Sequence, residues 1–450
     1  MDNIKLSVFT PTHNPAYIDE LYESLLEQNY LNWEWIIVTN GENTINIHKE
    51  LTAKFKKDNR VQIYKHKIPE NSYDSEKALE PNIGALKKQA CGYATGDYLV
   101  EVDHDDLLNT NAFEEVIKYI KKETPDFIFS DFCEFYSDWS CRYYNDENGW
   151  DKYEFMYKNK ALIAMSAMDI LPRSLYQIYY APNHIRIWKK DFYEKIGGHD
   201  ENLKVCDDHD LVCRTYLNNG KMVKIPKPLY LYRLQDNNNN SYLKYNQEIQ
   251  VTQQEIGNKY FYKMVDKWCT DNGLLKIDLG GAFNKPEGYL SVDLLDIADI
   301  KCDITNGIPL EDNSVGIVRA YDFLEHIPRE KYYLEKTDSE DVKLMKTNAF
   351  IDLMNEIHRV LAPNGWLLSA TPTGNSKAGW QDPTHVNPIN TNTFWYFTNK
   401  AYSQYVPEIK CRFQDTRIWE HTIDNQSDLR YTCADLLCLK DNKVSGLVKI

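Results

Sequence analysis

The sequence has no long uninterrupted apolar run, no closely spaced cysteine pair and no excess of positive charge. No stretch approaches the roughly 18 apolar residues of a membrane-spanning helix, and the first residues lack the apolar core of a signal peptide. We therefore expect a cytoplasmic protein with no transmembrane segment. The ten cysteines are scattered and form no C-x-x-C pair, which disfavours a zinc cage or the disulfide framework of a secreted protein.

Charge and length narrow the remaining classes. The formal net charge is -15, whereas a protein that binds duplex nucleic acid normally presents a basic face, so no nucleic-acid partner is expected. Nucleotide ligands remain open, because loop amides and metal ions can hold their phosphates. A chain of 450 residues exceeds one ordinary hydrophobic core, and two domains are expected.

Strand and helix patterns alternate twice along the chain. The first series has strands at 5–9, 35–38, 61–64 and 98–102, and helices at 18–28 and 82–94. An asparagine-rich stretch at 235–241 and a polar helix at 245–268 follow, and then come strands at 274–279, 289–292, 315–319 and 366–370, a helix at 348–361 and a turn at 363–365. Such alternation predicts mainly parallel sheets that bind ligands at the carboxyl ends of their strands. We expect an α/β protein with two Rossmann-like domains, 1–240 and 273–450, joined by a helical connector at 241–272.

An acidic loop follows the fourth predicted strand. Asp103, Asp105 and Asp106 lie just beyond an apolar run. Carboxylates spaced as D-x-D can bind one divalent ion, which in turn holds a diphosphate. The same residues could instead form a turn and cap a helix.

Four segments of the first half, in order, resemble family 2 glycosyltransferases of the GT-A fold. They are VFTPTHN at 8–14, WIIVTNG at 35–41, the segment 82–106 that ends in VEVDHDD, and IGGHDENLKVCDDHDLVCR at 196–214. The resemblance implies an inverting, metal-dependent sugar transfer from a nucleotide-sugar donor to a glycan or lipid-linked glycan, with Mn²⁺ or Mg²⁺ as cofactor.

Site residues follow from the same resemblance. Asp103 and Asp105 would hold the metal and the donor diphosphate, and the residues expected to line the nucleotide pocket are Pro11, Thr12, Asn40 and Lys87. Asp208 matches the general base, which must take the proton of an acceptor alcohol as the sugar bond forms.

Two departures from the family pattern change these expectations. The acid pair is Asp207-Asp208 rather than Glu-Asp, so Asp207 or Asp210 could share the role of base. The family's Tyr-Arg-x-His motif ends here in Gln235, a weak metal ligand, and His184 is the candidate substitute.

The second half contains a strand followed by a glycine turn and then a strand that ends in an acid. Glycines let a backbone approach a ligand closely, and an acid at the end of the second strand can bind ribose hydroxyls. The series IDLGG at 277–281, GYLSVD at 288–293, LEHI at 324–327, HRVLAPNG at 358–365 and DPTH at 382–385 resembles class I S-adenosylmethionine-dependent methyltransferases.

By this second resemblance, Asp278, Gly280 and Gly281 would cradle the methionine part of S-adenosylmethionine, Asp293 the ribose and Asp303 the adenine. Candidates for the base or for acceptor contacts are Glu325, His326 and His385. A histidine at a helix start is as often bonded to backbone as catalytic.

The function expected is a bifunctional glycan-modifying enzyme that transfers a sugar and O-methylates a sugar. The alternative is a glycosyltransferase with a non-catalytic methyltransferase-like module.

Overall fold

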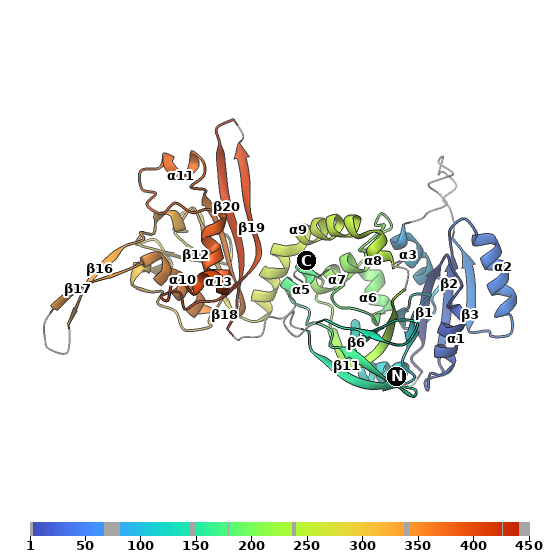
Figure 1. Ribbon diagram of the computed structural model, residues 1–450. Coiled ribbons are helices and arrows are strands. Elements are labelled where there is room, and N and C mark those ends of the chain that lie inside the picture. Colours follow the sequence, from blue (N-terminus) through green and yellow to red (C-terminus); the bar gives the residue numbers. More distant parts are fainter. Residues whose placement is uncertain are drawn as a thin grey trace. The chain divides into compact units, whose positions relative to one another are not determined.

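The computed structural model describes residues 3–66, 82–144, 150–178, 180–235, 240–336, 342–424 and 426–440 (Figure 1). The chain forms two compact units that divide between Met264 and Val265. This division falls inside helix α9 (Asn246–Asp271). The predicted domains, 1–240 and 273–450, end before this helix and begin after it. Asp236 and the asparagines 237–239, part of the stretch that suggested the first limit, lie outside the described residues.

The N-terminal unit is built on a large mixed sheet whose main strand order is β3-β2-β1-β4-β10-β6-β11-β5. Its strands are β1 (Leu6–Thr12), β2 (Trp33–Thr39), β3 (Val61–Lys65), β4 (Tyr98–Glu101), β5 (Leu107–Leu108), β6 (Phe127–Phe135), β7 (Cys141–Arg142), β8 (Lys152–Tyr157), β9 (Lys160–Met165), β10 (Arg186–Lys189) and β11 (Met222–Arg233). Only the first four strands of the order form the expected parallel sheet, because β10 pairs antiparallel with both β4 and β6.

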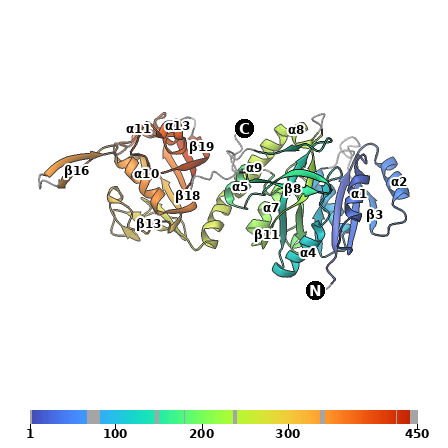
Figure 2. The ribbon, with the colours of Figure 1, turned by 60° about the horizontal axis from the view of Figure 1, so that its bottom comes forward.

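Helices cover both faces of this sheet, as Figure 2 shows. They are α1 (Ile18–Leu26), α2 (Thr44–Lys54), α3 (Ile83–Tyr93), α4 (Ala112–Glu123), α5 (Pro172–Gln177), α6 (Lys190–Lys195), α7 (Asp207–Leu217), α8 (Ser241–Lys244) and α9. Alternate residues of β1 face opposite layers: Leu6 and Val8 pack with α1, α2 and α4, whereas Phe9 packs with α3, α7 and α9. All seven residues of β1 and all seven of β2 are buried, as expected for strands that are covered on both faces.

The C-terminal unit has a seven-stranded sheet of order β14-β13-β12-β15-β18-β20-β19. Its strands are β12 (Leu275–Leu279), β13 (Leu290–Asp293), β14 (Ile300–Lys301), β15 (Val315–Tyr321), β18 (Leu361–Pro372), β19 (Phe413–Asp424) and β20 (Leu429–Cys438). The parallel strands are β14, β13, β12, β15 and β18, whereas β20 is antiparallel to both of its neighbours. The strand order reverses at β12, which creates a switch point where open α/β sheets bind ligands.

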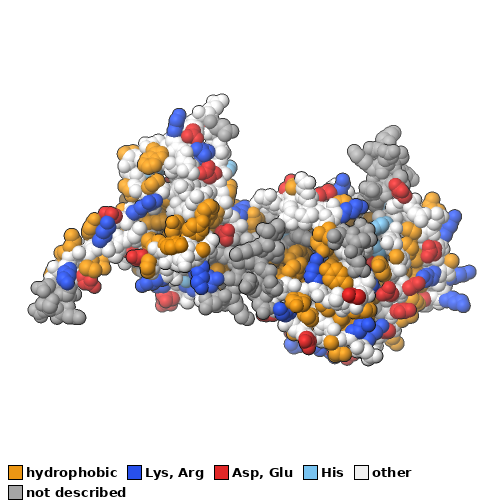
Figure 3. Space-filling view, in the orientation of Figure 1, with side chains coloured by type: hydrophobic (Ala, Val, Ile, Leu, Met, Phe, Trp, Pro, Cys, Tyr) orange, Lys and Arg blue, Asp and Glu red, His pale blue; other side chains and the backbone are white. Residues whose placement is uncertain are grey.

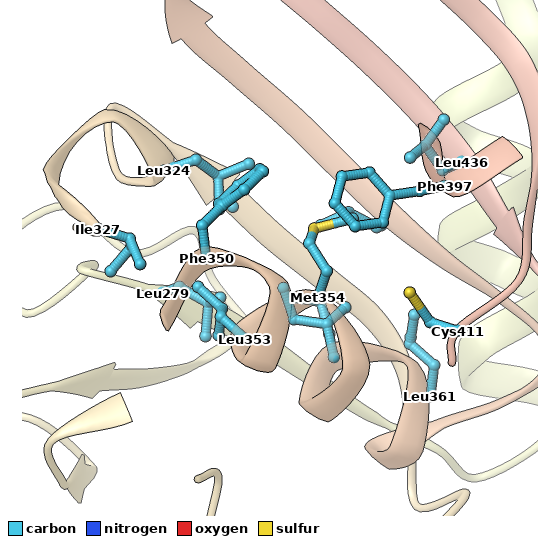
Figure 4. Close-up of a cluster of buried hydrophobic side chains, with 14 of the residues drawn as sticks. Leu279, Leu324, Ile327, Phe350, Leu353, Met354, Leu361, Phe397, Cys411 and Leu436 are labelled. Atoms are coloured by element: carbon cyan, nitrogen blue, oxygen red, sulfur yellow. The ribbon is translucent and has the colours of Figure 1, made fainter. Parts of the chain in front are cut away.

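One amphipathic helix, α10 (Ala349–Val360), supplies much of the core of this unit. Figure 4 shows Phe350, Leu353 and Met354 of α10 beside Leu279 of β12. The remaining short helices are η2 (Ile304–Asn306), η3 (Leu324–His326), α11 (Ala378–Gln381), η4 (Thr391–Phe394), α12 (Trp395–Thr398) and α13 (Lys400–Ser403). The predicted turn at 363–365 is instead an irregularity within β18, with Asn364 at a φ of 66°.

A separate hairpin, β16 (Lys331–Lys336) and β17 (Val342–Thr347), extends from the C-terminal unit. Apolar side chains lie exposed along it, including Leu334 and Leu344 (Figure 3). Among the described residues, no helix is both long and apolar enough to cross a membrane.

Candidate functional sites

The carboxyl ends of β1 and β2 meet beside the first predicted site. The backbone N–H of Asn40 donates to the carbonyl of Thr12 at 3.0 Å, which joins the two strand ends. Pro11 and Thr12 are buried, and Asn40 is half-buried just beyond β2. Three residues predicted to line a nucleotide pocket are therefore neighbours.

A buried carboxylate closes the end of β4. Glu101 is 1% exposed, and its side chain lies 2.6 Å from the Lys87 ammonium and 3.1 Å from Nε of Arg186. Burial raises the pKa of Glu101, but Arg186 and Lys87 together hold it well below the ordinary value. Lys87 is thus engaged by acids of the protein itself.

Lys87 reaches this position because α3 packs closely on the segment before α7. A Cβ at Gly84 would lie 2.0 Å from the carbonyl oxygen of Asp200, so only glycine permits this approach. The contact brings Lys87 of α3 to 3.3 Å from the carboxylate of Asp207.

A possible cation site lies where β4 ends and β10 begins. Glu101, Asp103 and His184 place one ligand atom each within 4.8 Å of one another. Asp103 exposes 36% of its side chain and lies 3.9 Å from Nε2 of His184. Arg186 also contacts that nitrogen, so an ion bound there would have to share the space with a guanidinium.

Asp105 is held by the residue that replaces the family histidine. The side-chain amide of Gln235 donates to Asp105 at 3.1 Å, and Arg233 donates to the Asp105 carbonyl at 2.7 Å. Asp105 does not belong to the group formed by Asp103 and His184. Its assignment as a metal ligand remains a prediction.

Asp106 and Tyr230 support the loop from beneath. The Tyr230 hydroxyl donates to Asp106 at 2.7 Å and accepts from the backbone N–H of Asp103 at 3.0 Å, and its ring stacks on His184. Burial, with the charges of Asp105 and Asp103, raises the pKa of Asp106 well above its ordinary value. Burial within this acidic loop therefore disfavours the ionised form of Asp106.

The predicted acid pair opens helix α7. Asp208 exposes 19% of its side chain; Oδ2 lies 2.6 Å from Nη2 of Arg186, and Oδ1 accepts from the N–H of His209. Asp207 points inward, 3.3 Å from Lys87. Only Asp208 of the pair thus has appreciable access to solvent.

Opposite pKa shifts separate the two acids. Burial raises the pKa of Asp207 to about 7, against the attraction of Lys87 and with the repulsion of Asp208. Burial acts on Asp208 too, but Arg186 and Lys87 outweigh it and lower its pKa. Asp208 is accordingly the member that stays ionised.

Glu101 and Arg186 are site residues that motif reasoning missed. Each is a charged residue next to a run of apolar strand residues, YLVE in β4 and RIWK in β10. A charge in such a run must find a buried partner, and this signal could have identified both.

The predicted cofactor turn of the C-terminal unit follows β12. Gly280 has a φ of +74°, and a Cβ there would lie 2.6 Å from the Phe323 ring. Gly281 packs on the side chain of Asp278, which is buried and paired with Arg319 at 2.7 Å. Asp278 thus shapes the turn and has a protein partner of its own.

Asp293 and Asp303 lie at the neighbouring strand ends. Asp293 ends β13, is half-buried and accepts from the N–H of Leu295 at 3.2 Å. Asp303 caps η2 and accepts from Thr305 and Asn306. Asp293 therefore has more capacity left for a ligand than Asp303.

The predicted catalytic residues Glu325 and His326 converge with His385. One ligand atom of each lies within 4.8 Å of the others, and the two rings are 5.0 Å apart. Glu325 is buried, and the two histidines are half-buried.

Comparison with known proteins identifies the N-terminal part. The sequence profile of glycosyl transferase family 2 matches residues 7–177, which are therefore a family 2 glycosyltransferase domain. Glycosyltransferase GlyG of Streptococcus pneumoniae is 26% identical over 237 residues, covering 51% of this chain and 70% of GlyG. The O-antigen biosynthesis protein RfbC of Myxococcus xanthus is 21% identical over 227 residues, covering 50% of this chain and 15% of RfbC. Among solved structures, S. aureus TarS 1-349 in complex with UDP-GlcNAc aligns with 18% identity and a TM-score of 0.39, covering 54% of this chain and 61% of that chain.

Proposed function

We propose that the N-terminal unit transfers a sugar, with inversion, from a nucleotide-sugar donor to a hydroxyl of a glycan or lipid-linked glycan. The observation that carries this proposal is the position of Asp208. It is an ionised, partly exposed carboxylate, linked through Arg186 and Glu101 to the acidic loop at the end of β4. The family 2 profile over residues 7–177 supports the reaction class.

Asp208 can act as the base because only part of its hydrogen-bonding capacity is used. An ionised carboxylate has about four acceptor positions, and Arg186 and the His209 N–H occupy two of them. The position of Asp208 at the start of α7 favours negative charge. Its remaining lone pairs can take the proton of an acceptor hydroxyl.

A divalent ion, Mn²⁺ or Mg²⁺, is the proposed cofactor of this unit. Asp103 and His184 provide a carboxylate and an imidazole 3.9 Å apart. When bound, such an ion stabilises the charge of a departing diphosphate. Asp105, which accepts a hydrogen bond from Gln235, is the second carboxylate that we propose as a ligand of this ion.

Nucleotide binding tests the first proposal. Calorimetric titration with uridine, guanosine and thymidine diphosphates, with and without Mn²⁺, should show one nucleotide that binds more tightly with the ion. Asp103→Asn should remove the gain from Mn²⁺, whereas Asp19→Asn, an exposed change on α1, should keep it. Binding of none of the three nucleotides with or without Mn²⁺ would contradict the assignment.

For the C-terminal unit we propose S-adenosylmethionine-dependent O-methylation of a sugar. The switch point at β12, the positive φ of Gly280 and the half-buried Asp293 support a cofactor position, with Asp293 on the ribose hydroxyls. Asp278, Gly281 and Asp303 would shape the pocket. S-adenosylmethionine supplies an activated methyl group; Glu325 and His326 are the residues proposed to contact the acceptor.

Binding of S-adenosylhomocysteine tests the second proposal. The wild-type chain should bind it, and Asp293→Ala should weaken binding by tenfold or more. Asp296→Ala, an exposed change in the following loop, is the matched control. Nucleotide binding without S-adenosylhomocysteine binding would favour the alternative, a glycosyltransferase with a non-catalytic C-terminal module.

A further inference from the structure

The carboxylate–histidine cluster of the C-terminal unit is rigidly supported. Glu325 and His326 belong to η3, and the residues on either side of them, Leu324 and Ile327, are buried in the core (Figure 4). The side chains of Glu325 and His326 are therefore positioned by a packed element.

The segment that carries His385 is fastened to the same short helix. The backbone N–H groups of Val386 and Asn387 both donate to the carbonyl oxygen of Glu325, each at 2.9 Å. Residues 60 positions apart in sequence are thereby held in one small cluster, with Nε2 of His385 4.0 Å from Oε1 of Glu325.

Hydrogen bonds assign the proton of each imidazole. Nδ1 of His385 lies 3.1 Å from the carbonyl of Gly379, which can only accept. Nδ1 of His326 lies 3.1 Å from the Thr384 hydroxyl, which donates its own hydrogen to Asp382, and 3.3 Å from the Thr384 carbonyl. Both rings therefore carry hydrogen on Nδ1, which leaves the lone pair on Nε2.

Glu325 brings a buried oxygen with no hydrogen-bond partner. Oε2 accepts from the Thr371 hydroxyl at 2.9 Å, but Oε1 has no partner, and the residue is 1% exposed. In the described part of the chain, no lysine or arginine pairs with Glu325. An unpaired carboxylate oxygen in the interior is costly, and nearly all such atoms are satisfied by some ligand.

We infer that Glu325, His326 and His385 bind a divalent transition-metal ion such as Zn²⁺. Two imidazoles and one carboxylate form the donor set of many catalytic zinc sites, which keep an open position. Zinc ligands lie about 2.0–2.2 Å from the metal, so atoms within 4.8 Å need to approach by roughly 1 Å through side-chain rotation. An imidazole that donates Nδ1–H to a carbonyl is the usual support of a ligating histidine.

Asp382 stands at the solvent side of the site. The Asp382 side chain is 45% exposed, and its carboxylate lies 4.0 Å from Nε2 of His385. An ion at this place could bind an acceptor hydroxyl from solvent and lower its pKa. That consequence rests on the proposed methyl transfer, whereas the metal site itself does not.

Metal titration of the full-length chain tests the inference. All variants carry Asp103→Asn, so that the N-terminal cluster contributes less to binding, and Co²⁺ is the probe because its visible spectrum reports imidazole coordination. The parent should bind about one Co²⁺ at the C-terminal cluster and exchange it for Zn²⁺. His385→Ala and Glu325→Gln should lose that spectrum, and His421→Ala, an exposed histidine on β19, should keep it.

Glu325→Gln keeps the shape of the side chain, so folding and metal binding can be read separately. Without metal it should melt at or above the temperature of the parent, because a buried carboxylate has been removed, yet Zn²⁺ should no longer raise that temperature. Equal Co²⁺ binding by the parent and both ligand variants, or no binding by the parent, would overturn the inference. Both outcomes are independent of nucleotide and S-adenosylhomocysteine binding.

Discussion

The two units each bring a carboxylate and histidine together beyond the ends of parallel strands, but they treat the charge differently. In the N-terminal cluster, Glu101 is paired with Lys87 and Arg186, and the guanidinium also contacts His184. In the C-terminal cluster, Glu325 has one hydroxyl partner and one unpartnered oxygen.

This difference separates a buried carboxylate that the protein's own cations compensate, Glu101, from one that they leave uncompensated, Glu325. Buried cations that already compensate Glu101 hold the acids of the N-terminal site in a fixed arrangement, which suits a charged diphosphate donor. The carboxylate of Glu325 faces two imidazoles and no cation among the described residues, an arrangement that a bound cation would complete. A substitution in either cluster should therefore have a different effect on activity and stability.

The largest effect is expected from the base of the N-terminal site. Asp208→Asn should lower kcat for sugar transfer by about 10²–10⁴-fold, because a positioned base contributes this much, while nucleotide diphosphate binding stays within a few-fold. Initial rates with the nucleotide sugar whose nucleotide binds would measure it. Asp19→Asn, an exposed change on α1, is the control, and an Asp208→Asn rate within tenfold of wild type would assign the base elsewhere.

The second prediction compares the two buried glutamates directly. Glu101→Gln should reduce the free energy of unfolding by about 3 kcal/mol, because two buried cations each lose one of their carboxylate partners. Glu325→Gln should change it by less than about 1 kcal/mol or increase it, because no cation is left unpaired. Chemical denaturation without metal measures both values.

Lys88→Met serves as the surface reference for that experiment, since the Lys88 side chain is 40% exposed and should matter by less than about 0.5 kcal/mol. If both glutamate variants lost the same stability, the two clusters would not differ in the way their charges are paired.

The last prediction concerns the pH dependence of stability that arises from Asp207 in the N-terminal cluster. Because burial raises the pKa of Asp207 to about 7, the native state binds a proton more tightly than the unfolded chain does. Stability from this group is therefore present below the unfolded pKa of about 4 and is lost as pH rises through 7. The loss should be at most about 4 kcal/mol, and Asp207→Asn should remove it.

Thermal melts of wild type and Asp207→Asn between pH 4 and 8 would show this, with convergence at the acid end. The same range tests the base. If Asp208 is the base, sugar transfer loses activity only below the ordinary aspartate range, since its pKa is lowered. If the rate of sugar transfer instead fell as the pH dropped through about 7, Asp207 would be the base.

Motifs and periodicity predicted the local elements well. Strands at 61–64, 274–279 and 315–319 and the helix at 348–361 lie within about two residues of β3, β12, β15 and α10. These segments are predictable because side-chain periodicity is a local property of the chain. The order of the motifs also carried the family assignment of residues 7–177, whereas the methyltransferase assignment remains a prediction.

The sequence by itself determined which acids lie at the ends of local elements: Asp103 follows β4, Asp208 lies at the start of α7 and Asp293 ends β13. Tertiary structure alone decided what these acids and their neighbours touch. The antiparallel insertion of β10 brings Arg186 to Glu101, and two backbone hydrogen bonds bring His385 to Glu325. Local patterns cannot show such meetings, because burial and charge pairing depend on contacts between segments far apart in the chain.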